Sequence, residues 1–185
     1  MVGPAQHLTT AELLFASGDR HHELVRGVVR VSEPPGGAHG WIAARITHRL
    51  GSHVEQHGLG TVLVEAGYVL RRDPDTVRAP DVSFISAARL PPEQIPEQFI
   101  PGAPDLAIEI LSPGDRWPDV EERLADYFAG GTRIAWVVEP RQQRVIVRYP
   151  DGASKILTGS DVLDGEDVVP GFRCPVTEVF GSGGG

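Results

Sequence analysis

The sequence predicts an α/β fold in which flanking helices pack on a mixed β-sheet, and two kinds of pattern support this prediction. Apolar residues recur every four positions at Ile42, Ile46, Leu50 and Val54, which is the spacing of one helix face. Residues 134–138 are continuously apolar, as expected of a strand buried on both faces. Helical and strand patterns alternate without a strict βαβ repeat, which favours a mixed sheet over a fully parallel one.

The first elements are a short helix and a hairpin. Thr9 and Glu12 have the spacing of a capping box, which predicts a helix that ends at Gly18. The β-rich runs 22–25 and 28–31 flank an Arg-Gly pair, so we expect a β-hairpin there.

The helix marked by the four-residue spacing should extend for roughly 17 residues and end at Gly58, after a Pro/Gly-rich loop at 33–40. The pattern beyond it predicts strands at 61–70, 82–86 and 106–111, a turn at 73–75, an exposed loop at 88–104 with at most one helical turn, a helix stopped at 130–131, a strand at 134–138 and a hairpin of 145–149 with 155–157.

Length and composition favour one domain in the cytoplasm. The chain has 185 residues, so we expect a single domain over residues 1–180, followed by a flexible glycine-rich tail at 181–185. No apolar run is long enough to span a bilayer, and residues 1–6 lack the features of a signal peptide. Cys174 is the sole cysteine, which excludes an internal disulfide and a cysteine-rich metal site.

The net charge of −8 speaks against a broad basic footprint for nucleic acid. It does not exclude an enzyme that meets phosphate through a bound metal, because the ion can dominate the local charge. Only one of the 17 basic residues, Lys155, is a lysine, which indicates a bias along the whole chain.

Two acids stand out because they lie within apolar sequence. Glu109 is near the end of the strand 106–111, where an unpaired buried charge would cost several kcal/mol. Asp105 is four residues earlier, about 13 Å away at about 3.3 Å per residue, which is too far for a shared ion. Asp81 opens the preceding strand, and adjacent strands are about 4.8 Å apart, so Asp81 is the expected partner. Two carboxylates with a backbone carbonyl and waters suit Mg²⁺ or Mn²⁺.

A set of ordered motifs carries a family resemblance from about residue 10 to residue 180. The landmarks are 22–27 (HELVRG), the helix start at His39, 78–81 (RAPD), 104–113 (PDLAIEILSP), 115–117 (DRW), Tyr127, 136–140 (WVVEP) and 163–172 (LDGEDVVPGF). This chain resembles the Uma-type restriction-endonuclease-like proteins of the PD-(D/E)XK nuclease superfamily.

The resemblance implies a restriction-endonuclease-like core and a Mg²⁺-dependent (or Mn²⁺-dependent) endonuclease acting on nucleic acid, most plainly DNA. It makes Asp81 and Glu109 the metal-binding acids. We expect the Ile110 carbonyl to complete the shell and Glu23 to point toward the same cleft from the N-terminal hairpin. Leu111 stands where the strand lysine usually falls. Proteins of this kind look as though they supply that lysine from the next helix, at the position of Arg123 here.

Alternatives remain open from the residues alone. Arginine keeps the lysine's charge but is hard to deprotonate, so a catalytically inactive binding or assembly module of the same fold is the main alternative, and a hydrolase of another phosphate ester is a third. Asp81 and Glu109 could instead be strand-end acids bonded to backbone amides or an arginine, and Glu23 could be a cross-strand partner of an arginine. Arg123 could instead pair with its helix neighbours Glu122 or Asp126. His53 and His57 have an i, i+4 spacing that could chelate zinc, although no third ligand follows. A homodimer is expected if both strands of DNA are cut.

Overall fold

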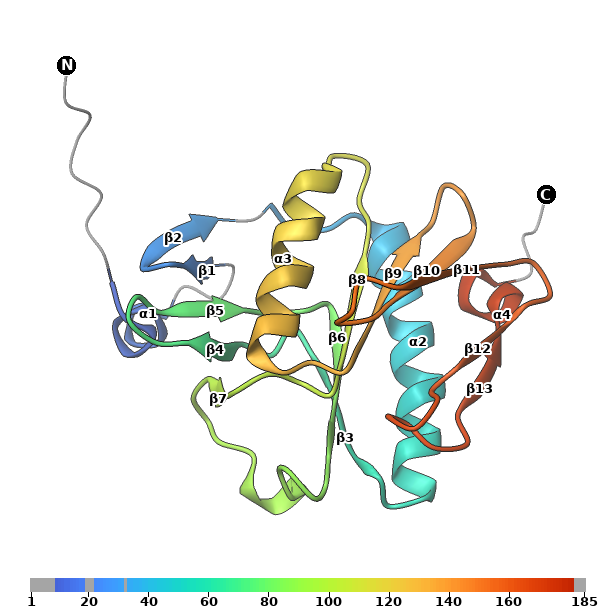
Figure 1. Ribbon diagram of the computed structural model, residues 1–185, viewed down its shortest axis with the longest axis horizontal. Coiled ribbons are helices and arrows are strands. Elements are labelled where there is room, and N and C mark those ends of the chain that lie inside the picture. The colour runs from blue at the N-terminus through green and yellow to red at the C-terminus, as the bar shows by residue number, and fades with distance from the viewer. Residues whose placement is uncertain (1–8, 19–21, 32, 182–185) are drawn as a thin grey trace.

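The computed structural model describes residues 9–18, 22–31 and 33–181, and Figure 1 shows its helices on the two sides of a twisted β-sheet. The helical segments are α1 (Ala11–Ser17), α2 (Gly37–Gln56), the 3₁₀ turn η1 (Pro92–Gln94), α3 (Trp117–Gly130) and α4 (Val176–Phe180). The strands are β1 (His22–Val25), β2 (Val28–Val31), β3 (Gly60–Val64), β4 (Tyr68–Arg71), β5 (Thr76–Arg78), β6 (Val82–Ser86), β7 (Ile100–Pro101), β8 (Leu106–Ile110), β9 (Ile134–Glu139), β10 (Arg144–Arg148), β11 (Ser154–Thr158), β12 (Val162–Asp164) and β13 (Arg173–Pro175).

The strands form two mixed sheets and a small hairpin. The larger sheet has the order β11-β10-β9-β8-β6-β3, the second has the order β2-β1-β5-β4-β7, and β12 pairs with β13. In the larger sheet only β8 and β9 run parallel, and α3 connects them as the crossover that parallel neighbours require. This is the mixed α/β architecture predicted from the sequence.

The central strands are buried on both faces. Side chains of α2 pack with Leu106, Ile108 and Ile110 on one face of β8. Side chains of α3 pack with Ala107 and its neighbours on the other face, which is the face that carries Glu109. The site acid therefore lies under a helix, at the edge of the core.

Several predicted elements are confirmed, including the strand at 82–86 and the hairpin β1–β2. The hairpin turns through Arg26 and Gly27. Both have positive φ (51° and 79°), as a two-residue type I′ turn requires. The third helix ends against Gly131 in the left-handed conformation.

Other details differ from the sequence predictions. The cap of α1 is Thr10, whose hydroxyl accepts the Leu13 N–H, and not Thr9. Helix α2 begins at Gly37, so the loop before it is shorter than expected and His39 lies in the first turn of the helix. The helix has 20 residues, more than the predicted length, because the spacing of apolar residues marks only the buried part of a helix.

The predicted strand 61–70 is two strands in different sheets. Glu65, with φ of 50°, breaks the extended chain between β3 and β4. The loop predicted at 88–104 also contains β7, a short strand parallel to β4 that includes the buried Ile100. The expected tail 181–185 falls outside the described residues except for Gly181.

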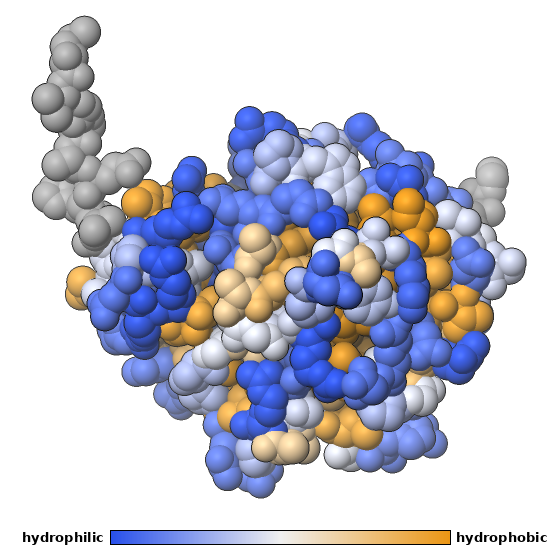
Figure 2. Space-filling view, in the orientation of Figure 1, coloured by the Kyte–Doolittle hydropathy of each residue, from blue (hydrophilic) through white to orange (hydrophobic). Residues whose placement is uncertain are grey.

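None of the described helices is both long and apolar enough to cross a membrane. On the face shown in Figure 2, hydrophilic residues predominate and hydrophobic ones form separate patches.

Candidate metal and phosphate site

Asp81 and Glu109 come together through the pairing of β6 with β8. The two strands are antiparallel with Val82 opposite Ile108, and one further step along that register sets Asp81 opposite Glu109. Directly opposed residues in such a pair have Cβ atoms about 5 Å apart on one face. In addition, Asp81 Oδ2 accepts the Ile110 N–H at 2.6 Å, which holds the aspartate against the end of β8. The structure therefore brings together the two acids that were paired from the sequence.

Asp105 has a different place, at the start of β8. It is buried, accepts the Ser86 N–H at 2.8 Å and forms an ion pair with Arg89 at 2.9 Å. These contacts join the start of β8 to the end of β6 and to Arg89.

Glu109 is a buried carboxyl, only 6% exposed. Tyr127 donates its hydroxyl to Oε1 at 2.7 Å, and Arg123 Nε lies 2.8 Å from Oε2. Burial raises the pKa of Glu109, and the adjacent Asp81 charge adds to the rise, whereas Arg123 and Tyr127 oppose it. Negative charge at this strand end is therefore only partly compensated by the protein.

Arg123 projects from α3 between two acids. Besides Glu109, it contacts Asp115 through a terminal nitrogen at 3.3 Å. Burial disfavours its charged form, but the Glu109 carboxylate outweighs this and raises the pKa of Arg123, so the guanidinium stays protonated. Its expected alternative partners, Glu122 and Asp126, contact Arg78 instead, so that interpretation of Arg123 is wrong.

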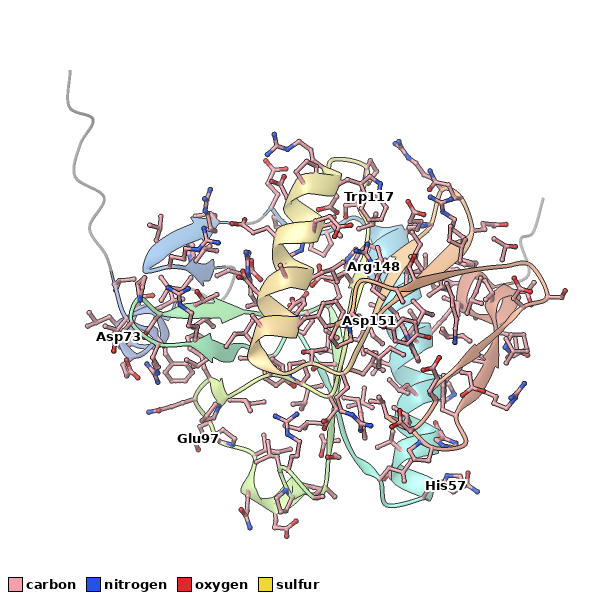
Figure 3. All side chains as sticks on the ribbon, viewed as in Figure 1. His57, Asp73, Glu97, Trp117, Arg148 and Asp151 are labelled. Atoms are coloured by element: carbon pink, nitrogen blue, oxygen red, sulfur yellow. The ribbon has the colours of Figure 1, made fainter. Side chains whose placement is uncertain are left out.

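An ion pair connects helix α3 to the neighbouring strand β10. Arg148 of β10 lies beside it (Figure 3) and forms a two-pronged ion pair with Glu121 at 2.6 and 2.9 Å. Trp117 marks the helix start in the same view and is partly exposed. This ion pair joins α3 to β10.

Glu23 both lines the cavity and pairs with an arginine. It lies on β1 and lines the same cavity as Asp81. Its Oε2 accepts from Arg78 at 2.8 Å and its Oε1 accepts the Ala79 N–H at 3.1 Å. Glu23 is thus an arginine partner whose carboxylate sits at the cavity wall, next to the segment that leads to Asp81.

His39 reaches Asp81 from the first turn of α2. Its Nε2 lies 3.1 Å from Asp81 Oδ2, and the residue is 9% exposed. The hydrogen bond to Asp81 raises the pKa of His39 against the effect of burial. Both contacts of Asp81 use Oδ2, and Oδ1 accepts no hydrogen bond from the described residues.

A cavity of about 550 Å³ opens over these groups. Its basic side chains are Arg123 and two histidines, His22 and His39. Its acidic side chains are Glu23, Glu33, Glu65, Asp81, Glu109 and Asp115. The lining thus attracts cations more than bare phosphate.

The donor set of this cavity fits Mg²⁺ or Mn²⁺. These ions prefer oxygen ligands, and Mg²⁺ is usually held by one or two carboxylates while it keeps several waters. Within the described part of the chain, no three His, Cys, Asp or Glu side chains group closely enough to hold an ion by themselves. The Asp81–Glu109 pair is therefore the available carboxylate set, and Ile110, which also lines the cavity, is the available main-chain donor.

The histidine pair proposed for zinc is elsewhere. His57 lies at the C-terminal end of α2 (Figure 3), at the opposite end of the helix from His39. Its Nδ1 and the Nε2 of His53 both contact main-chain carbonyl oxygens, at 2.8 and 2.9 Å. These main-chain contacts explain the positions of the His53 and His57 rings.

Sequence reasoning assigned no role to Tyr127 or Asp115, although Tyr127 contacts Glu109 and Asp115 contacts Arg123. It did consider that His39, near the helix start, could reach the site. One signal was present: Arg123 and Tyr127 are four residues apart, so they share a face of α3 and both meet Glu109. Asp115 carries no comparable signal, because it lies in the loop before α3, and the His39 contact with Asp81 depends on how α2 packs on the sheet.

A mixed sheet flanked by helices, with paired carboxylates and a basic side chain at the ends of β6 and β8, defines the class of restriction-endonuclease-like proteins. The chain belongs to the Uma2 family, described as "Putative restriction endonuclease", whose model matches residues 8–177.

A solved structure supports the same fold. It is a crystal structure from Anabaena variabilis ATCC 29413, described as a "putative nuclease belonging to DUF820", with a TM-score of 0.77 and 21% sequence identity. The match covers 86% of this chain and 89% of that chain. At this identity the similarity establishes the fold alone. A search of curated proteins finds no match.

Proposed function

We propose that this protein is a Mg²⁺- or Mn²⁺-dependent endonuclease-like hydrolase of phosphodiester bonds, with nucleic acid, in the first instance DNA, as its substrate. The observation that carries the proposal is the opposition of Asp81 and Glu109 across β6 and β8, with Arg123 beside them on one cavity. Membership of the Uma2 family supports the same class of chemistry.

In this proposal Asp81 and Glu109 hold the metal, and the Ile110 carbonyl is the third protein ligand. When bound, such an ion polarises the phosphodiester and lowers the pKa of an attacking water. The Ile110 N–H and His39 hold Asp81 by one oxygen, Oδ2, which leaves Oδ1 to serve as a ligand.

Arg123 has an electrostatic role in this scheme. Its raised pKa keeps it from acting as a proton donor or acceptor, so it contributes positive charge next to the scissile phosphate. Tyr127 and Arg123 fix the two oxygens of Glu109 from the same helix face. Glu23 contributes negative charge at the cavity wall and holds Arg78.

The test is cleavage of plasmid DNA with Mg²⁺ or Mn²⁺ by wild type, Asp81→Asn and Asp119→Asn. Asparagine at position 81 keeps the side-chain shape and can still accept the Ile110 N–H, so folding should survive. Asp119→Asn is the same chemical change at an exposed position of α3 and is the matched control. We expect Asp81→Asn to lose activity roughly 100-fold, while the control retains it. Equal cutting by all three, or none by wild type, would refute the proposal.

A second candidate is a non-catalytic binding or assembly module of the same fold. It is favoured by the Arg123–Glu109 ion pair, because the guanidinium at 2.8 Å already neutralises the acid that a metal needs. Titration calorimetry separates the two: this candidate expects negligible Mn²⁺ binding to wild type, whereas the nuclease expects binding that Asp81→Asn removes.

A further inference from the structure

A second hollow adjoins the acidic cavity. It is a groove of about 470 Å³ between α2 and the end of β3. Its floor is aliphatic and formed by small side chains of α2 and the half-exposed Val64 of β3; the apolar residues are Pro35, Gly40, Ala43, Ala44 and Val64.

The groove and the acidic cavity are continuous. Pro35, His39, Glu65 and Asp81 line both of them. The groove follows α2 as far as His48, and nine helical steps from His39 to His48 cover about 13–14 Å at 1.5 Å per residue. That length exceeds the roughly 3.4 Å between successive nucleotides along a strand, so a strand whose phosphate lies at Asp81 can place a neighbouring nucleoside over the groove.

The chemistry of the groove suits an uncharged, flat group. Among the described residues that line it, none is lysine or arginine, and Glu65 and Asp81 carry negative charge, so it does not favour a phosphate. Enzymes that extrude a base hold it in a pocket between aromatic or apolar side chains, and the lining of this groove is of the apolar kind.

Two residues that line the groove each carry a polar atom that is shielded from solvent and has no hydrogen-bond partner among the described residues. These atoms are Nδ1 of His39 and Oγ1 of Thr47. Threonine in a helix divides between two χ1 rotamers, so the Thr47 hydroxyl and methyl can exchange positions. An apolar pocket with a few polar groups at its margin is typical of a small-molecule or base site.

We infer that this groove binds an unpaired nucleobase next to the scissile phosphate, and that single-stranded nucleic acid is therefore the preferred ligand. The inference rests on the proposed function for the identity of the ligand. A base in a duplex is stacked and paired, so it cannot enter the groove without being extruded, at an energetic cost that a single strand does not bear.

Two glycines of α2 provide a matched pair of substitutions. Gly40 lines the groove, whereas Gly51 lines neither the groove nor the acidic cavity. A Cβ at either position meets no atom within 4 Å, so a side chain can begin at both without a clash. Replacing glycine within a helix also favours the folded state. Gly40→Leu thus fills the groove, and Gly51→Leu makes the same change outside it.

The experiment measures fluorescence anisotropy of a labelled 15-nucleotide oligothymidylate and of a duplex of the same length, with Ca²⁺ as an oxygen-binding ion. We expect wild type and Gly51→Leu to bind the single strand roughly tenfold or more tighter than the duplex. Gly40→Leu should lose that preference while its duplex binding is unchanged. Equal single-strand binding by the two variants, or no single-strand binding by wild type, would overturn the inference.

Cleavage assays distinguish this result from the proposed function. Asp81-dependent cutting of single strands with the same KM in Gly40→Leu as in Gly51→Leu would support the nuclease and overturn the groove assignment. Loss of single-strand binding in Gly40→Leu, with no cutting by wild type, would support the groove and refute the nuclease.

Discussion

Arg78 joins three acids from two elements, and its removal should be costly. Its side chain is 5% exposed and lies 2.8 Å from Glu23, 2.7 Å from Asp126 and 3.5 Å from Glu122. Removing one partner of a buried ion pair costs about 3–5 kcal/mol because the other charge is left unpaired. Glu23 and Asp126 are 20% and 18% exposed, so water can partly solvate them and the lower end applies. We expect Arg78→Met to lose about 3 kcal/mol of unfolding free energy.

The assay is urea unfolding, with Arg116→Met as the matched control. Arg116 pairs with Asp119 on the surface, where the two side chains are 76% and 47% exposed, and such pairs contribute less than about 1 kcal/mol. At about 2–4 °C per kcal/mol, Arg78→Met should also lower the Tm by roughly 6–12 °C. A loss below about 1 kcal/mol, no larger than that of the control, would refute the assignment of this network as a buried anchor of α3.

Three other predictions concern a titrating acid, a glycine and the site arginine. Burial alone would raise the pKa of Asp75, but hydrogen bonds from the α1 backbone and from Arg72 lower it. Asp75→Asn should therefore lower the free energy of unfolding by about 1 kcal/mol at pH 7. That difference between wild type and variant should shrink as the pH falls below about 3.9, and a pH-independent difference in urea unfolding would contradict it. Gly60 has φ of 153°, and a Cβ there would lie 2.1 Å from the Ile85 carbonyl oxygen. Gly60→Ala should therefore lower the Tm by at least about 5 °C. An unchanged Tm would show that the backbone relaxes without cost and would contradict the prediction. Arg123→Lys should keep at least roughly a tenth of the cleavage rate and Arg123→Gln far less, since charge is the retained property; equal rates for the two variants would exclude the electrostatic role.

The helices and the central strands could be predicted because their signals are local. Repetition every four residues identified α2, and glycine stops identified the ends of α1 and α3. The break between β3 and β4 had no such signal. Glu65 and Gly67 interrupt an otherwise largely apolar run, but a single acid or glycine also occurs within strands, so they did not mark the break. The break depends on contacts from elsewhere: a Cβ at Gly67 would lie 2.4 Å from the Phe99 ring, so the chain passes close to a side chain 32 positions away.

The acidic pair was predictable for a geometric reason. The register of two paired strands is fixed by the need to place the apolar side chains of both in the core. In β6 and β8 that register sets Asp81 opposite Glu109. The partners of the pair were not predictable. Tyr127 and His39 reach it from helices on opposite sides of the sheet, and helix docking depends on the complete packed surface.

The sequence by itself determined the fold class, the family resemblance and the two acids, because alternation, helical spacing and strand separation are properties of short segments. Only the tertiary structure decided what surrounds those acids: the Arg123 ion pair with Glu109, the His39 contact with Asp81, and the groove beside them. The physical reason is that these features arise where α2 and α3 pack on opposite faces of one sheet, and no short segment contains both sides of such a contact.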